Sequence, residues 1–206
     1  MQTKLNFLSS VLALVICLMP ANAVAGGDME YEKARNLFAV GDYAEAAKNL
    51  QIAVDKGHSA ARLPLAAMYR DGMGVQQDPA TALKLFTIAA REGYPSAQFT
   101  LGAMYRAGEG SDVNYPLAKK WFLAAARQGD EGSQNNLGTM YENGRGVRSS
   151  QETALMWYEV AKANGSERGA INHKRLSRKL SEDEVFRAKK RAQDCLRSRY
   201  RKCDAT

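Results

Sequence analysis

The stretch LGAMYRAGEG, residues 101–110, carries the strongest structural information in the chain because it recurs at a fixed spacing. The same pattern, Leu-(Ala/Gly)-x-Met-Tyr-x-x-Gly-x-Gly, begins at Leu65 and again at Leu137, so each copy starts 36 residues after the one before. A second block keeps the same period, and its members are Ala82/Ala118/Ala154, Leu85/Trp121/Trp157, Phe86/Phe122/Tyr158, Ala89/Ala125/Ala161 and Gly93/Gly129/Gly165. A period of this length is typical of proteins built from repeated supersecondary units.

Each copy contains two segments with the apolar spacing of amphipathic helices. In residues 97–105, apolar side chains recur every three or four positions, and Gly108 suits the left-handed conformation that often follows a helix end. Residues 118–125 carry a second stripe, which Gly129 ends. One such pair cannot bury its apolar face alone, so successive pairs must stack. The sequence therefore predicts an all-α, right-handed α-solenoid of antiparallel helix pairs.

These motifs resemble the Sel-one-like repeat (SLR) family. The resemblance rests on Leu-Gly-x-Met-Tyr-x-x-Gly-x-Gly-Val followed by Ala-x-x-Trp-(Phe/Tyr)-x-x-Ala, and it predicts repeats at 59–94, 95–130 and 131–166. It implies a tetratricopeptide-like fold and an adaptor role in assembly, signalling, envelope regulation or host interaction. Upstream, residues 26–58 contain Gly-Asp-Tyr-Ala-Glu-Ala and are predicted to form an N-terminal tetratricopeptide-like helix pair.

Two further positions predict where helices begin. Pro64 lies inside the first helix of its repeat, so we expect that helix to begin late, with Pro64 in its first turn. Residues 167–206 are predicted to form a degenerate repeat and a basic capping helix. Ser181-Glu182-Asp183-Glu184 has the pattern of a capping box. The apolar stripe of the capping helix comprises Val185, Ala188, Ala192, Leu196 and Tyr200.

The first 25 residues have the order of parts of a secretory signal peptide. Lys4 precedes an apolar run over residues 5–19, and Pro20 is followed by two small-x-small cleavage patterns, one ending at Ala23 and one at Ala25. The run is short for a membrane span. We therefore expect a periplasmic or secreted protein that is not an integral membrane protein, with an uncleaved N-terminal anchor as the alternative.

The formal net charge is +7, and the basic residues are concentrated at the C-terminus. Residues 167–206 contain 13 lysines and arginines against 6 acidic residues. A basic tail can bind nucleic acid, but export makes that partner unexpected. Anionic envelope polymers, lipid headgroups or an acidic protein fit better, and a solvated helix face without a ligand is the remaining explanation.

Cys195 and Cys203 are the cysteines left after removal of residues 1–25. Eight residues of α-helix would separate their Cα atoms by roughly 12 Å, which is beyond disulfide reach. We therefore expect the helix to end near Arg199 and the chain to fold back, so that the two cysteines form an intramolecular disulfide in an oxidising compartment. Intermolecular pairing and two free thiols are the alternatives.

Residue patterns for catalysis are scarce. The two histidines, His58 and His173, lack metal-ligand spacing, and the chain has neither a Gly-x-Ser-x-Gly elbow nor a Ser-x-x-Lys motif. We therefore predict no enzyme activity, catalytic residue, metal or cofactor. A cysteine-rich branch of the resembled family is linked to penicillin binding and β-lactam hydrolysis, which makes a cell-wall enzyme the alternative. This chain lacks the cysteine pair per repeat that marks that branch.

A protein partner of unknown identity is the expected ligand, bound on the concave face of the solenoid. The first helix of each pair usually lines that face. Its predicted binding residues are Leu63, Ala67, Arg70, Phe99, Ala103, Arg106, Asn135, Thr139 and Glu142. Leu63 and Phe99 are expected to point away from the core, where they either contact the partner or are single exposed apolar residues without a ligand, as is common at protein surfaces.

Overall fold

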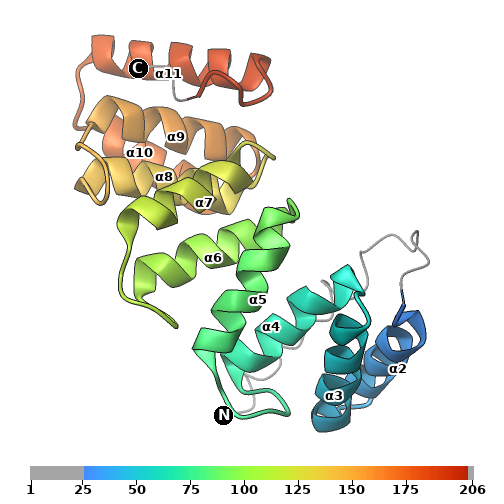
Figure 1. Cartoon of the computed structure of the whole chain (residues 1–206). Coiled ribbons are helices and arrows are strands. Elements are labelled where there is room, and N and C mark those ends of the chain that lie inside the picture. Colours follow the sequence, from blue (N-terminus) through green and yellow to red (C-terminus); the bar gives the residue numbers. More distant parts are fainter. Residues whose placement is uncertain (1–25, 204–206) are drawn as a thin grey trace. The chain divides into compact units, whose positions relative to one another are not determined.

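The computed structural model describes residues 26–203, and every regular element in this range is helical (Figure 1). The proposed signal peptide, residues 1–25, lies outside the described residues. The elements are α2 (Asp28–Ala39), α3 (Tyr43–Asp55), the 3₁₀ turn η1 (Ser59–Ala61), α4 (Arg62–Asp71), α5 (Pro79–Arg91), α6 (Pro95–Ala107), α7 (Tyr115–Ala126), α8 (Glu131–Asn143), α9 (Gln151–Ala163), α10 (Glu167–Ser177) and α11 (Glu182–Arg197). The prediction of an all-α repeat solenoid is confirmed.

The chain divides into two compact units, with the boundary between Ala89 and Ala90 inside α5. In the first unit, α2 packs against α3, and α3 contacts α4. The side chain of Asp42 caps α3 by accepting a hydrogen bond from the backbone N–H of Glu45. Pro64 is the third residue of α4, where its missing N–H leaves no helical carbonyl unpaired. The expected late start of this helix is confirmed.

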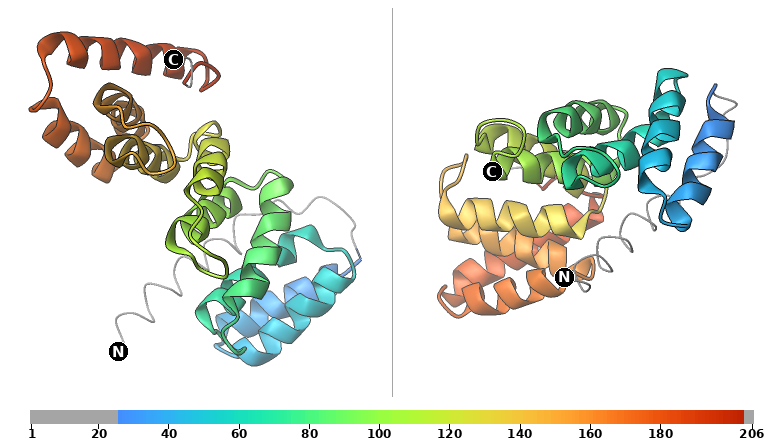
Figure 2. Two further views of the ribbon diagram at one scale, coloured as in Figure 1. Left: turned by 60° about the vertical axis from the view of Figure 1, so that its left-hand side comes forward. Right: turned by 90° about the horizontal axis from the view of Figure 1, so that it is seen from below.

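In the second unit, α6 pairs with α7 and α8 with α9, and both α10 and α11 pack against α9 (Figure 1). Figure 2 shows the α8 to α11 part of this unit, coloured yellow to red, from two further sides. Because α9 has neighbours on several sides, eight of its thirteen residues are buried. The core around α9 includes Phe122, Leu137, Trp157 and Leu176 together with Ala188 of α11. The C-terminal helix therefore closes the last repeat.

The second glycine of the repeated motif permits a close backbone contact at Gly74 and at Gly146. Gly146 has φ 70°, and a Cβ added there would lie 2.6 Å from the Cβ of Tyr115, the first residue of α7. In the first unit, a Cβ on Gly74 would collide with the backbone of Tyr43, the first residue of α3. The loops after α4 and α8 thus rest on the N-termini of α3 and α7, and at Gly74 and Gly146 only glycine fits both the conformation and the space.

The end of the chain differs from its predicted course in one detail. The capping box at Ser181 and Glu184 is present, and α11 ends at Arg197, close to the predicted end near Arg199. Arg199 and Tyr200 then adopt left-handed conformations, with φ 50° and 64°. Tyr200, which was predicted on the apolar stripe of the helix, therefore lies beyond the helix end. The turn brings the Cα atoms of Cys195 and Cys203 to 4.6 Å, a separation that fits an intramolecular disulfide.

Candidate protein-interaction face

The first helices of the repeats in the second unit, α6 and α8, carry six of the predicted binding residues. Spacings of three and four residues place Phe99, Ala103 and Arg106 on one side of α6, and Asn135, Thr139 and Glu142 on one side of α8. Arg106 is exposed and the other five are half-buried. We call these six residues, together with Asn172 and Arg175 of α10, the A-helix face.

Phe99 does not project freely from this face. Its ring centroid lies 6.1 Å from that of Phe122, and a Cβ added to Gly132 of α8 would come within 3.0 Å of the Phe99 ring. The side chain is therefore wedged among α6, α7 and α8, where the absence of a side chain on Gly132 makes room for it. The expectation that Phe99 points away from the core is corrected, and its half-buried ring contributes to packing between repeats.

In the first unit, the expectation for Leu63 and Ala67 is also corrected, because both are buried, with 4% and 5% exposure. The reason is that residues 63–68 of α4 form an unbroken apolar run longer than one helical turn, and all six are buried. Such a run covers every side of the helix at this level, so it is enclosed by neighbouring elements. Leu63 and Ala67 are therefore not exposed on the surface of α4, where a partner could contact them.

Arg70, the third predicted residue of α4, is half-buried and engaged within its own unit. Its Nε and Nη2 donate to the two carboxylate oxygens of Asp71, both at 2.8 Å. Its guanidinium carbon lies 5.8 Å from the ring centroid of Phe86, in cation–π range. These contacts hold the Arg70 side chain in place within the first unit.

A polar network joins α8, α9 and α10 on the A-helix face. The Glu142 carboxylate accepts two hydrogen bonds from Arg175, at 2.7 and 2.6 Å, and a third from the Tyr158 hydroxyl at 2.8 Å. The Arg175 guanidinium holds the pKa of Glu142 below its usual range, while burial raises the pKa of Tyr158. Thr139 lies 3.2 Å from the same hydroxyl. Glu142 is thus ionised and fixed in position.

Two hydrogen bonds connect neighbouring repeats across the same face. Arg106 of α6 donates from Nη1 to Oδ1 of Asn136 on α8, at 2.9 Å. Asn172 of α10 donates from Nδ2 to Oδ1 of Asn135, also at 2.9 Å. Asn172 and Arg175 were not predicted from the sequence, because α10 lacks the repeated motif. The 36-residue period therefore could not indicate which of its residues lie beside those of α8.

Buried amides form a second inter-repeat connection that the sequence analysis missed. The Nε2 atoms of Gln98 and Gln134 donate to the backbone carbonyls of Ala90 and Ala126, at 3.0 and 3.1 Å. Their side-chain carbonyls accept from Gln128 and Asn164, both at 2.8 Å. Tyr200 continues this amide ladder, because its hydroxyl donates to Oδ1 of Asn164 at 3.0 Å. Gln98 and Gln134 are 36 residues apart in the sequence, and this spacing could have identified them as equivalent positions of two repeats.

The buried His173 lies beside a carboxylate. Its Nε2 is 2.9 Å from Oε2 of Glu159. This close contact with His173 lowers the pKa of Glu159 to about 2. Among residues 26–203, no group of three histidine, cysteine or acidic side chains is placed to hold a metal ion. No helix within this range is long and apolar enough to cross a membrane.

The Glu159 contact gives a pH-dependent contribution to stability. Because the folded pKa is depressed to about 2, the contribution is complete above the unfolded value near 4.3 and is lost as pH falls toward 2. We expect Glu159→Gln to lower the unfolding free energy by about 1–2 kcal/mol at neutral pH, allowing for solvent screening. Urea denaturation at several pH values should show this difference shrinking below pH 4.3. A difference that stays constant down to pH 2 would contradict the assignment.

Comparisons with known proteins agree with this architecture. A Sel1 repeat protein from Oxalobacter formigenes is 31% identical, with a TM-score of 0.65 over 76% of this chain and 65% of that one. The structure of c5321, a protective antigen present in uropathogenic Escherichia coli strains that displays an SLR fold, is 28% identical, with a TM-score of 0.66 over 84% of this chain and 40% of that one. This chain thus spans less than two thirds of either relative. A search of the curated proteins found no match.

The family comparison matches most of the chain. The Sel1 repeat model covers residues 26–58, 60–94, 95–130 and 132–166. It therefore places residues 26–58 among the Sel1 repeats, where the sequence suggested a tetratricopeptide-like pair. The resemblance of the repeated motifs is confirmed, and the chain belongs to the Sel1 repeat family.

Proposed function

We propose that this chain is an exported, non-enzymatic adaptor that binds a protein partner through the A-helix face of its second unit. Sel1 repeat proteins are protein-interaction adaptors, which supports the general class. The choice of face rests on one observation: hydrogen bonds between repeats hold its polar side chains in place. Arg106 is held by Asn136, Asn135 by Asn172, and Glu142 by Arg175.

Preorganised side chains favour binding because less rotamer freedom is lost when the partner docks. Arginine is enriched in protein interfaces, and its planar guanidinium binds carboxylates with two parallel hydrogen bonds. The exposed Arg106, whose hydrogen bond goes to the neutral amide of Asn136, therefore makes this face suited to a partner with acidic side chains. The half-buried Phe99 and Ala103 supply apolar contact area between those polar groups.

Export rests on the signal-peptide pattern of residues 1–25 and on the cysteine pair. Disulfides persist in oxidising compartments, and the 4.6 Å Cα separation of Cys195 and Cys203 fits one. N-terminal sequencing of the protein recovered from the periplasm or the medium should give a chain that begins after Ala23 or Ala25. Recovery of an intact N-terminus in the cytosol would contradict this part of the proposal.

The binding face is tested by affinity capture with cross-linking from the envelope and medium fractions. We expect Arg106→Glu to reduce recovery of the partner at least tenfold, because it reverses a charge on the face and breaks the bond to Asn136. Arg148→Glu is the matched control: Arg148 is an exposed loop residue of the same unit, outside the A-helix face. Equal recovery with both variants would show that the partner binds elsewhere.

A further inference from the structure

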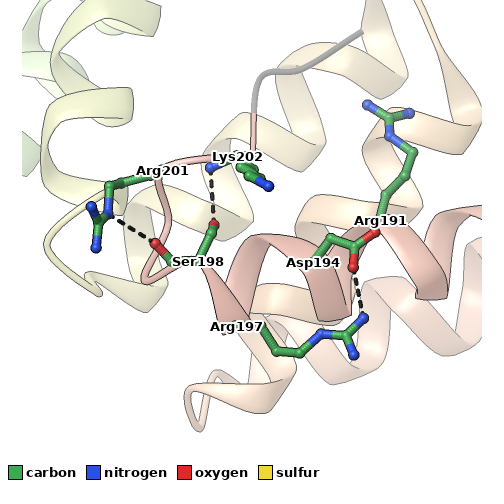
Figure 3. Close-up of a pocket in the computed structure, with 6 residues that line it drawn as sticks. All are labelled: Arg191, Asp194, Arg197, Ser198, Arg201 and Lys202. Carbon is green, nitrogen blue, oxygen red and sulfur yellow. Dashed lines mark hydrogen bonds and ion pairs between the residues drawn. The ribbon is translucent and has the colours of Figure 1, made fainter.

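A pocket of about 650 Å³ lies at the C-terminal end of α11, and none of the residues that line it belongs to the A-helix face (Figure 3). It is lined by Arg191, Asp194, Arg197, Ser198, Arg201 and Lys202. Four of these six side chains are cationic and one is acidic. Part of the positive charge of the C-terminal segment is therefore gathered around this pocket, and the rest lies along the exposed face of α11.

The cations of this pocket differ in how far they are neutralised. Arg197 donates to Asp194 at 2.7 Å, and Arg191 lies 3.5 Å from the Glu152 carboxylate. Arg201 and Lys202 are exposed, and among the described residues, which end at Cys203, neither has a carboxylate in ion-pair range. Two positive charges that line the pocket thus have no acidic partner among residues 26–203.

The loop that carries these two residues is held in one conformation. Cys195 and Cys203 close it, and the Ser198 hydroxyl accepts a hydrogen bond from the Lys202 backbone N–H at 3.0 Å. Arg201 donates from Nε to the Ser198 carbonyl at 3.2 Å (Figure 3). The Tyr200 hydroxyl fastens the loop to Asn164. The disulfide and the Tyr200 hydrogen bond are explained if they attach this loop to the last repeat. That role does not explain why Arg201 and Lys202 have no acidic partner among residues 26–203.

We propose that this disulfide-closed loop binds the phosphate group of an anionic ligand. A phosphate monoester carries a charge of about −1.5 to −2 at neutral pH, so it can interact with more than one of the four cations that line the pocket, where a single carboxylate carries only one charge. An arginine guanidinium offers parallel N–H donors to phosphate oxygens, and a lysine adds a compact point charge. Arg201 and Lys202 line the pocket together with Arg191 and Arg197, so an anion bound there lies among four cationic side chains.

The first test is a titration of the purified full chain with inorganic phosphate at constant ionic strength, followed by backbone amide NMR. We expect chemical-shift changes at residues 197–202 and about tenfold weaker binding for Arg201→Glu or Lys202→Glu, the change that 1.4 kcal/mol corresponds to. Lys189→Glu and Lys190→Glu are matched controls, because both lysines are exposed on α11 outside the pocket. Their phosphate affinity should equal that of the unmodified chain.

Reduction of the disulfide separates a built site from a merely basic surface. Dithiothreitol, which is uncharged, should weaken phosphate binding about tenfold while far-UV circular dichroism shows that the repeats remain folded. The Cys195→Ser/Cys203→Ser variant should reproduce this loss without reductant. Unchanged phosphate affinity after reduction, an equal loss in the Lys189 or Lys190 variants, or acetate binding as tightly as phosphate would each overturn the proposal.

Two sources of the phosphate are distinguished with vesicles. Phosphatidylcholine vesicles containing phosphatidic acid should sediment the chain if the ligand is a lipid headgroup, and Arg201→Glu should abolish this, whereas vesicles of phosphatidylcholine alone should not bind. Phosphate binding without vesicle binding would assign a soluble phosphate-bearing ligand to the same pocket. Failure of both arms would overturn the phosphate site but would leave the A-helix face untouched, because Arg106→Glu tests that face separately.

Discussion

Replacing Trp157 with alanine should lower the unfolding free energy by about 4 kcal/mol, the usual cost of removing a fully buried aromatic side chain. Trp157 has no exposed surface and belongs to the cluster that contains Ala188 and Ala192 of α11. Its indole N–H is buried without a hydrogen-bond partner in the described structure, so the expected loss comes from packing. Chemical denaturation followed by circular dichroism measures it.

Trp121 provides the matched control, because it occupies the same motif position one repeat earlier. It is only half-buried, with the Lys120 ammonium 5.2 Å from its ring centroid. Trp121→Ala should therefore cost about 1 kcal/mol, in line with the smaller apolar area it removes from contact. Similar costs for the two variants would mean that α11 does not cover the last repeat as the structure places it.

The second large effect is expected at Gly146. Gly146→Ala should lower the unfolding free energy by about 3 kcal/mol, because a non-glycine residue in the left-handed region costs about 1–2 kcal/mol and overpacking adds about 1–3 kcal/mol. The new Cβ would lie 2.6 Å from the Tyr115 Cβ and 2.8 Å from its carbonyl carbon. Backbone atoms at the start of α7 would have to move.

Gly144→Ala separates the conformational cost from the collision. Gly144 also has a positive φ, 67°, but a Cβ there would lie 3.4 Å from the nearest atom, the Cβ of Ser149. We expect a loss of about 1 kcal/mol for this variant. If both variants cost the same in denaturation experiments, the second glycine of the motif is required only for its backbone angles and the contact with Tyr115 is unimportant.

The fold was largely predictable from the sequence because its signals are local. The 36-residue period, the motif glycines, Pro64 and the capping box at Ser181 each act within one turn or one helix pair. The return of the chain toward Cys195 followed from the length of a helical segment that would otherwise keep the two cysteines apart.

The candidate site was predicted less well because it depends on neighbours that no local pattern reveals. Leu63 is buried because it belongs to the apolar run 63–68 of α4, all of which is enclosed. The Phe99 ring packs against Gly132 of the next repeat, where the missing side chain leaves room for it. Arg175 meets Glu142 across 33 positions of sequence. Helical spacing places residues on a face, but packing between repeats decides which of them solvent reaches.

Tyr200 illustrates the same limit at the chain end. Its spacing from Leu196 fits one more helical turn, yet the chain leaves the helix at Arg197 and the Tyr200 hydroxyl bonds Asn164 instead. The competing contact comes from the amide ladder, which is a tertiary feature. The basic pocket has the same origin, because the turn and the cysteine pair gather residues 197–202 that a continuous helix would spread around its axis.

The central claim is that a protein partner binds the A-helix face, and photo-cross-linking in living cells tests it most directly. A benzophenone amino acid would replace Arg106 or Arg175 on that face, and Lys120 of α7 or the loop residue Arg148 as controls, all four being exposed in the second unit. We expect irradiation to join one and the same protein to the chain from positions 106 and 175, and from neither control. Adducts formed equally from all four positions, or from the controls alone, would contradict the claim.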